Sequence, residues 1–220
     1  MKQQSGSVVI YLFFAIALFA ALTVSIMRGN EYDNPDREKI RMNLNVMQSF
    51  GSNISHAIKR LKANGCTNET ISFKNIYDAP YNNTSSPSDN SCHIFDVNGG
   101  GIDYTYPPDY ITPEVGALDW WDGLYVYTTG VNIPDIGTDD DDLLMFVKIK
   151  SKKTCDIIND TLNGAEAPFI GGYCLTPYSG VFQNYCGATQ DWTNAAGQTS
   201  GCVYGGSPTK YTYYQVLINR

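Results

Sequence analysis

Six cysteines are the residues of this chain with the clearest chemistry. All of them follow an apolar N-terminal stretch, and their even number is typical of a disulfide framework. None forms the C-x-x-C pair of a zinc ribbon or a thioredoxin site, and only two histidines are present to help bind a metal. We therefore expect disulfides formed in an oxidising compartment. The six residues are Cys66, Cys92, Cys155, Cys174, Cys186 and Cys202.

Several pairings of these cysteines are compatible with their spacing. The simplest hypothesis joins neighbours along the chain. Its three pairs are Cys66 with Cys92, Cys155 with Cys174, and Cys186 with Cys202. The first pair would order the polar stretch that it encloses.

Five aspartates lie close together in the segment DIGTDDDDLL. Carboxylates at alternate positions suit a hard cation such as calcium, but the segment lacks the glycine and the final glutamate of an EF-hand loop. We favour a solvated acidic loop that faces the lysines of KIKSKK, and we predict no metal site and no cofactor. The aspartates are Asp135, Asp139, Asp140, Asp141 and Asp142, and the lysines are Lys148, Lys150, Lys152 and Lys153.

Aromatic side chains are abundant, with three tryptophans and sixteen tyrosines. Trp120, Trp121 and Trp192 could form a surface that stacks on sugars or on partner proteins. The alternative is that such rings pack in the interior, as tyrosine does in disulfide-rich secreted folds.

No motif of an enzyme active site is present. The chain contains no G-x-S-x-G, P-loop or H-E-x-x-H segment. His56 lies within a predicted helix and His93 lies beside Cys92, so a structural role is expected for both. We predict no catalytic residues and no enzyme. A secreted hydrolase that uses a pair of carboxylates is the competing enzyme hypothesis.

Charge is unevenly distributed along the 220 residues, whose net charge is -7. Residues 65–220 hold seven Lys or Arg against eighteen Asp or Glu. Nucleic acid is therefore not expected as a partner, because phosphate binding needs clustered basic residues. The length leaves room for one domain behind the N-terminal segment.

The N-terminal segment is long enough to span a bilayer. Val8 to Met27 is free of charge, and twenty helical residues extend about 30 Å. A signal peptide cleaved after Ser25 is the alternative. The basic residues that follow the segment would, taken alone, keep the body in the cytoplasm, whereas the cysteines favour an extracytoplasmic body.

An amphipathic helix is predicted directly after the apolar segment. Apolar residues recur there at steps of three and four, which predicts one buried stripe. Pro35 indicates the start of this helix or a kink, and Asn64-Gly65 indicates its end. The two segments together would form one helix over 7–64, although an anchor followed by a separate core helix fits the same pattern. The stripe consists of Ile40, Leu44, Met47, Phe50, Ile54, Ile58 and Leu61.

The remaining sequence predicts an antiparallel sheet with long loops. Residues 66–119 indicate loops with short strand pieces, and 171–207 indicate a loop pinned by disulfides. Strands are predicted at GLYVYTT, LLMFVKIK and YTYYQVLI, and a helix is predicted at TCDIINDTLNG, with Gly164 as its stop.

This order of elements resembles the type IV pilins and the pseudopilins of type II secretion. In that family a short polar leader is removed after a glycine, and the matching residues here are Gly6 and Ser7, with Lys2 as the basic residue of the leader. Tyr11 stands five residues after that cut, where the family usually has Glu. The resemblance therefore implies a minor or divergent subunit.

The sequence as a whole predicts an α+β protein, in which a long N-terminal helix packs on a small antiparallel sheet with disulfide-closed loops. The expected organisation is a leader at 1–6, a transmembrane half-helix at 7–30, an amphipathic half-helix at 31–64 and an extracytoplasmic head at 65–220. The resemblance implies a structural subunit of a cell-surface filament or secretion apparatus, with an adhesive role open. Its partners would be the inner membrane, other pilin-like subunits, and a surface glycan or protein. The alternative from another class is an anchored or secreted module that binds glycan or protein.

Overall fold

The computed structural model divides into two compact units, Met1–Lys39 and Ile40–Arg220. The structure describes residues 10–20, 23, 35–75, 81, 83–119, 121–171, 176–182, 191–206 and 209–220.

Residues 10–20 are helical, as is Thr23. The Thr23 hydroxyl donates to the carbonyl oxygens of Phe19 and Ala20 at 3.0 and 2.9 Å, so a polar side chain in an apolar sequence is satisfied by its own helix. The rest of the predicted half-helix at 7–30 lies outside the described residues. Within the described ranges, no helix is both long enough and apolar enough to cross a membrane.

Helix α2 comprises Pro35–Ala63 and matches the predicted amphipathic helix at both ends. Acidic residues occupy its first turn and basic residues its last turn, which complements the helix dipole. Gly65 has a positive φ of 97° and follows the end of the helix, as a C-terminal glycine does. All seven predicted stripe residues are buried. The stripe therefore attaches α2 to the body of the protein.

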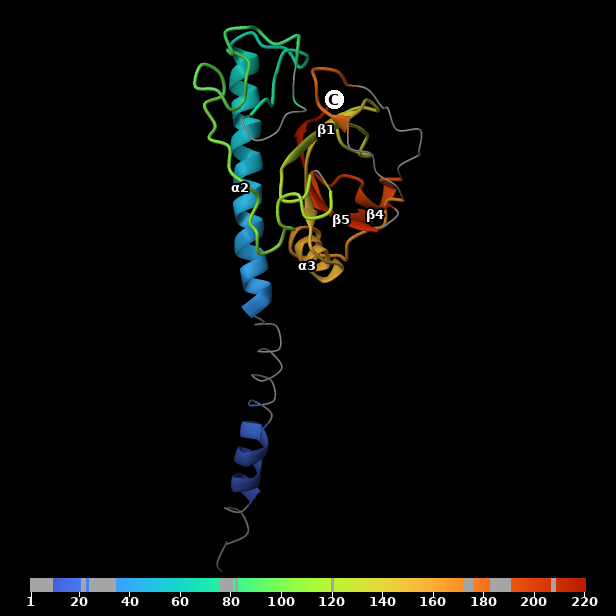
Figure 1. The fold of residues 1–220 in the computed structure, drawn as a ribbon. Helices are drawn as coiled ribbons and strands as arrows, with labels where there is room; N and C mark the ends of the chain where they lie inside the picture. The colour runs from blue at the N-terminus through green and yellow to red at the C-terminus, as the bar shows by residue number, and fades with distance from the viewer. Residues whose placement is uncertain are drawn as a thin grey trace, which may run out of the picture. The chain divides into compact units, whose positions relative to one another are not determined.

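The sheet is antiparallel and, in the part of the chain that is described, has the strand order β3-β1-β2-β5-β4 (Figure 1). Its strands are β1 (Val126–Val131), β2 (Asp142–Ile149), β3 (Thr176–Pro177), β4 (Ser200–Gly205) and β5 (Lys210–Ile218). The three predicted strands are confirmed as β1, β2 and β5. The prediction of loop throughout 171–207 is wrong for β3 and β4, because the edge strand β4 is stabilised by its pairing with β5.

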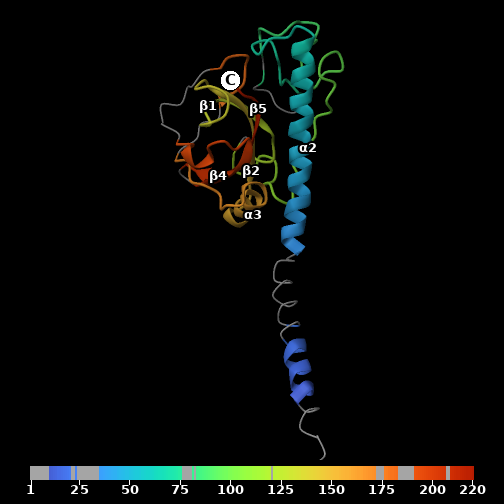
Figure 2. The same cartoon turned by 180° about the vertical axis from the view of Figure 1, so that it is seen from behind.

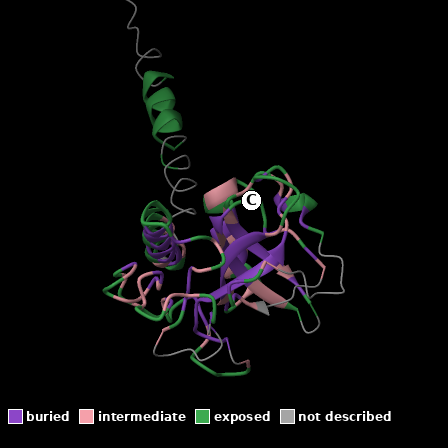
Figure 3. Ribbon diagram, turned by 90° about the horizontal axis from the view of Figure 1, so that it is seen from above, coloured by how far each residue is buried: buried purple, intermediate pink, exposed green. Residues whose placement is uncertain are grey.

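Both faces of the sheet are buried, and β1, β2, β4 and β5 each send residues into two different cores. Tyr127, Met145 and Tyr213 pack with the stripe of α2 in what we call the helix-side core. Val126 and Phe146 enter the loop-side core on the opposite face, which also holds residues from the surrounding loops. Figure 2 shows α2 along one side of the sheet, and Figure 3 shows the strands coloured mostly as buried.

Helix α3 comprises Lys152–Asn163 and confirms the second predicted helix. The Ser151 hydroxyl caps its first turn by accepting a hydrogen bond from the Thr154 amide at 3.2 Å. Gly164 ends the helix in the left-handed conformation, with φ 67°. A short 3-10 turn, η1, follows later at Thr193–Ala195.

Residues 66–119 connect α2 to the sheet without forming a named strand in their described part. A single bridge pairs Ser72 with His93, and the amide of Ile94 donates to the Ser72 carbonyl at 2.9 Å. The prediction of loops with short strand pieces is confirmed for these residues.

Candidate functional site

Two disulfides are present in the described part of the chain. The Cys66–Cys92 bond confirms the first predicted pair. Cys155 bonds to Cys202, so the predicted pairs Cys155 with Cys174 and Cys186 with Cys202 are wrong. The reason is topological: α3 and β4 pack in one core, which brings together cysteines separated by 47 residues. Cys174 and Cys186 lie outside the described residues.

The predicted processing residues Gly6 and Ser7 also lie outside the described residues. Tyr11 is described, and its side chain is exposed on a helical turn. Nearby apolar side chains of 10–20 share this exposure.

For the two tryptophans that are described, the alternative of packing in the interior is confirmed, and they form no stacking surface. Trp121 and Trp192 are both buried in the loop-side core. Trp192 packs against Phe146 and meets Tyr214 edge to face, with ring centroids 6.2 and 5.1 Å apart. Neither indole presents a face to a ligand, because burial against the sheet uses that surface. Trp120 lies outside the described residues.

The acidic loop is exposed at three of its five aspartates, as predicted, but it does not face the lysines of KIKSKK. Asp142 is fully buried and accepts hydrogen bonds from the amides of Ile133 and Arg220 at 3.4 and 3.1 Å. Burial raises the pKa of this carboxyl. Asp142 begins β2 and Lys148 lies near its other end, so about 20 Å of extended chain separates them. In the described ranges no cluster of His, Cys, Asp or Glu is arranged to hold a metal ion.

Lys148 instead belongs to a charge cluster that the sequence did not reveal. Its ammonium lies 2.6 Å from the buried Asp122 carboxylate and 2.8 Å from Asp119. Lys210 reaches the same Asp119 at 2.9 Å, and both lysines lie over the Trp121 ring at about 5.5 Å. Hydrogen bonds from Lys148 and Lys210 lower the pKa of Asp119. The cluster holds the turn before β1.

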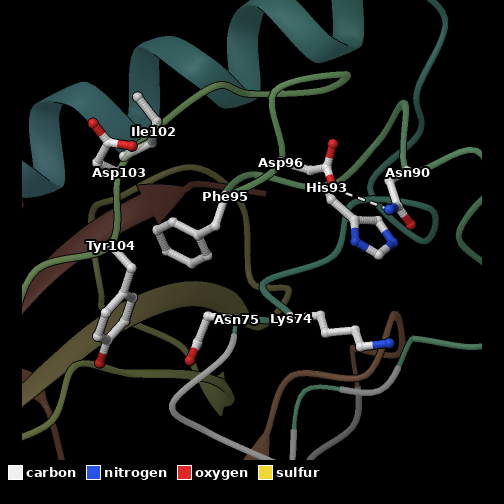
Figure 4. Close-up of a pocket in the computed structure, with 9 residues that line it drawn as sticks. All are labelled: Lys74, Asn75, Asn90, His93, Phe95, Asp96, Ile102, Asp103 and Tyr104. Carbon is white, nitrogen blue, oxygen red and sulfur yellow. Dashed lines mark hydrogen bonds between the residues drawn. The ribbon is translucent and has the colours of Figure 1, made fainter.

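One pocket combines polar groups with aromatic walls (Figure 4). Its volume is about 390 Å³. Three loop segments line it, at 74–75, 90–96 and 102–104. The residues are Lys74, Asn75, Asn90, His93, Phe95, Asp96, Ile102, Asp103 and Tyr104.

Backbone pairing makes the frame of this pocket rigid. The amide of Ser72 donates to the Cys92 carbonyl at 3.0 Å, and the amide of Ile102 donates to the Ile94 carbonyl at 3.2 Å. The Cys66–Cys92 disulfide joins the chain just after α2 to the pocket segment at 90–96. Arg60 of α2 donates a hydrogen bond to the Gly100 carbonyl. Three segments distant in sequence are therefore held as one unit.

Phe95 and Tyr104 provide the aromatic walls. Their ring centroids are 5.3 Å apart at an interplanar angle of 80°. Phe95 also lies 6.4 Å from Phe50 of α2 and 5.9 Å from Tyr127 of β1. The pocket thus rests directly on the helix-side core, which fixes the orientation of both rings.

Some polar side chains of the pocket already make hydrogen bonds within the protein, and others do not. Asp96 accepts from the Asn90 amide group and from the Asn98 backbone, each at 2.9 Å. The side chains of Lys74, His93 and Asp103 have no hydrogen-bond partner among the residues described. Burial lowers the pKa of His93, so the imidazole is neutral at pH 7.

Local sequence patterns do not predict this pocket. The position of His93 beside Cys92 indicated a structural role, and no spacing pattern links residues 74, 93 and 103. His56, by contrast, lies on α2 where it was predicted.

Comparison of the chain with protein-family models, with curated proteins and with solved structures gave no match.

Proposed function

We propose that the protein is a pilin-like structural subunit of the minor pilin or pseudopilin type. In this proposal its N-terminal helix is held in the inner membrane before assembly, and it later packs among other pilin-like subunits of a surface filament or secretion apparatus. The observation that carries the proposal is the exposed apolar surface of residues 10–20.

That surface is unusually apolar for a helix in contact with water. Eight large apolar side chains between residues 10 and 19 are each 57–74% exposed. Apolar surface of this kind favours transfer to lipid or to a protein partner, by about 25 cal/mol for each Å² buried. The eight are Ile10, Tyr11, Leu12, Phe13, Phe14, Ile16, Leu18 and Phe19.

Helix α2 contributes a second feature that suits an assembly subunit. Its stripe is used inside the protein, where it packs in the helix-side core. Met42 and Val46, on the same helix, are 61% and 54% exposed. Val46 also lines a groove of about 560 Å³ between α2 and residues 101–105. One helix can therefore attach the head on one side and meet a neighbouring subunit on the other.

The disulfides support an extracytoplasmic head. Cys66–Cys92 and Cys155–Cys202 form and persist in an oxidising compartment. The acidic character of the head gives no support to a nucleic acid partner.

The test is the N-terminus of the native protein, measured by intact mass and N-terminal sequencing of membrane and medium fractions. A start at Ser7 supports the proposal, because it indicates removal of the leader after Gly6. Gly6→Ala should then block the cleavage, whereas Ser5→Ala should leave it unchanged. A mature start near Ile26 would contradict the proposal, since the apolar helix would be lost.

A further inference from the structure

We propose that the pocket lined by Lys74, His93, Phe95 and Asp103 binds an acidic sugar residue. The sugar carboxylate would lie toward Lys74 and His93, its ring over Phe95, and its hydroxyl groups toward Asp103. This inference does not depend on the assembly function proposed above.

One end of the pocket presents the Lys74 ammonium as a possible partner for an anion. The Asp96 carboxylate at the same end is held by a hydrogen bond from Asn90. Figure 4 shows Lys74, His93 and Asn90 on one side of Phe95. The Lys74 ammonium makes no ion pair within the described part of the chain, although the protein carries a net charge of -7. An unpaired cation at the edge of a pocket can form a charge-assisted hydrogen bond with a carboxylate.

The middle of the pocket favours a flat body with apolar C–H groups. Phe95 is half-buried, and its neighbours in the helix-side core hold the ring in place. Tyr104 meets Phe95 edge to face and adds a second wall. A pyranose ring presents one face of C–H groups, which packs on an aromatic side chain while its hydroxyls remain free.

The other end of the pocket favours hydroxyl groups. Figure 4 shows Asp103 and Tyr104 on the side of Phe95 away from Lys74. The Asp103 carboxylate has no hydrogen-bond partner in the described ranges, so it can accept from the hydroxyls of a ligand. Each Asp96 oxygen already accepts one hydrogen bond, from Asn90 or from Asn98, which fixes the orientation of this carboxylate.

The size of the pocket limits the ligand to about one sugar residue. A volume of about 390 Å³ lies near the lower end of the range for small-molecule pockets, roughly 300–1,000 Å³. A neutral sugar would leave the Lys74 charge unused. The acidic sugar is thus the class that uses all three parts of the pocket.

The experiment titrates the full-length protein, kept in detergent micelles, with D-glucuronate and with D-glucose as the neutral control. Saturation-transfer NMR and calorimetry at pH 6 give the two affinities. We expect glucuronate to bind about tenfold more tightly than glucose, because one charge-assisted hydrogen bond separates them. Equal affinities, or no binding of glucuronate at 50 mM (about the weakest useful limit), would overturn the proposal.

Variants locate the site. Lys74→Gln should weaken glucuronate binding about tenfold and leave glucose binding unchanged. The matched control is Lys153→Gln, which removes an exposed lysine of α3. Asp103→Asn should weaken both sugars, and circular dichroism confirms folding of each variant. An equal effect of Lys74→Gln and Lys153→Gln would show that glucuronate responds only to overall charge, which contradicts a site at the pocket.

A final comparison distinguishes a free acid from a glycan. Glucuronate-terminated oligosaccharides should bind at least as tightly as the monosaccharide if the pocket recognises the terminal residue of a glycan. Clearly weaker binding of the oligosaccharides would contradict recognition of a glycan terminus and assign the pocket to the free acid sugar.

Discussion

Cys155 of α3 and Cys202 of β4 are joined by a disulfide that spans 47 residues of sequence. Both cysteines are fully buried, and they lie in the same core as the stripe of α2. The bond therefore ties the second helix to the edge of the sheet.

The stability of the head should depend on that bond. The double variant Cys155→Ser/Cys202→Ser should lower the free energy of unfolding by about 2–4 kcal/mol, because a long loop regains its freedom in the unfolded state. Urea denaturation of the full-length protein measures the change. Non-reducing peptide mapping should recover the Cys155–Cys202 peptide, and a peptide linking Cys155 to Cys174 would contradict the assignment.

Removal of the Lys148 charge should cost more than removal of an exposed lysine. The side chain of Lys148 is 12% exposed and that of its partner Asp122 is 0% exposed. Lys148→Met therefore leaves the buried Asp122 carboxylate without this ion pair. We expect a loss of about 3–5 kcal/mol in unfolding free energy. Lys153→Met on the surface of α3 should change it by less than about 0.5 kcal/mol. Equal effects of the two substitutions would refute a structural role for the cluster.

Truncation of two neighbouring residues on α2 should change the stability by very different amounts. Met47 is fully buried in the stripe, and Met47→Ala should destabilise the protein by about 2–5 kcal/mol. Val46 is exposed, and Val46→Ala should stay within about 0.5 kcal/mol. Thermal and urea unfolding of both variants test the assignment of the two helix faces. A large loss for Val46→Ala would show that this face is also covered.

His93 should make both stability and ligand binding depend on pH. Burial lowers its pKa, and Lys74 adds to this effect, while Asp96 and Asp89 oppose it. A lowered folded-state pKa means that the unfolded state binds more protons. The stability contribution of neutral His93 is therefore present above its unfolded pKa of about 6.5 and is lost as pH falls through the lower folded value.

Glucuronate affinity should change with pH in the opposite direction to stability. Protonation of His93 adds a positive charge beside Lys74, so glucuronate affinity should rise as the pH falls below about 6.5, the ordinary histidine pKa, because the pKa of His93 is lowered. NMR of the imidazole protons gives the pKa directly. His93→Gln should remove the pH dependence of glucuronate affinity and the part of the stability profile that His93 contributes. A pH dependence of affinity that persists in this variant would assign it to another group.

Much of the fold follows from local patterns in the sequence. The three-and-four spacing of the α2 stripe, Pro35 at its start and Gly65 after its end predicted the helix correctly. The same is true of α3, whose stop at Gly164 needs a positive φ that glycine adopts readily. Three strands were predicted because alternation and β-branched or aromatic residues are also local signals.

Other features depended on contacts between segments that are distant in sequence. Strand β4 is glycine-rich and has a weak local signal, and it exists through its register with β5. The same pairing decides that Cys202 meets Cys155, and the second covered face of the sheet decides that Trp121 and Trp192 are buried.

The candidate site shows the same division. The sequence by itself determined that the chain has an apolar N-terminal segment, an amphipathic helix, an antiparallel sheet and enough cysteines to bond its loops. Only the tertiary structure decided that Lys74, His93 and Asp103 line one pocket around Phe95. The physical reason is that periodicity and capping act over a few residues, whereas a pocket between loops is set by packing across the whole domain.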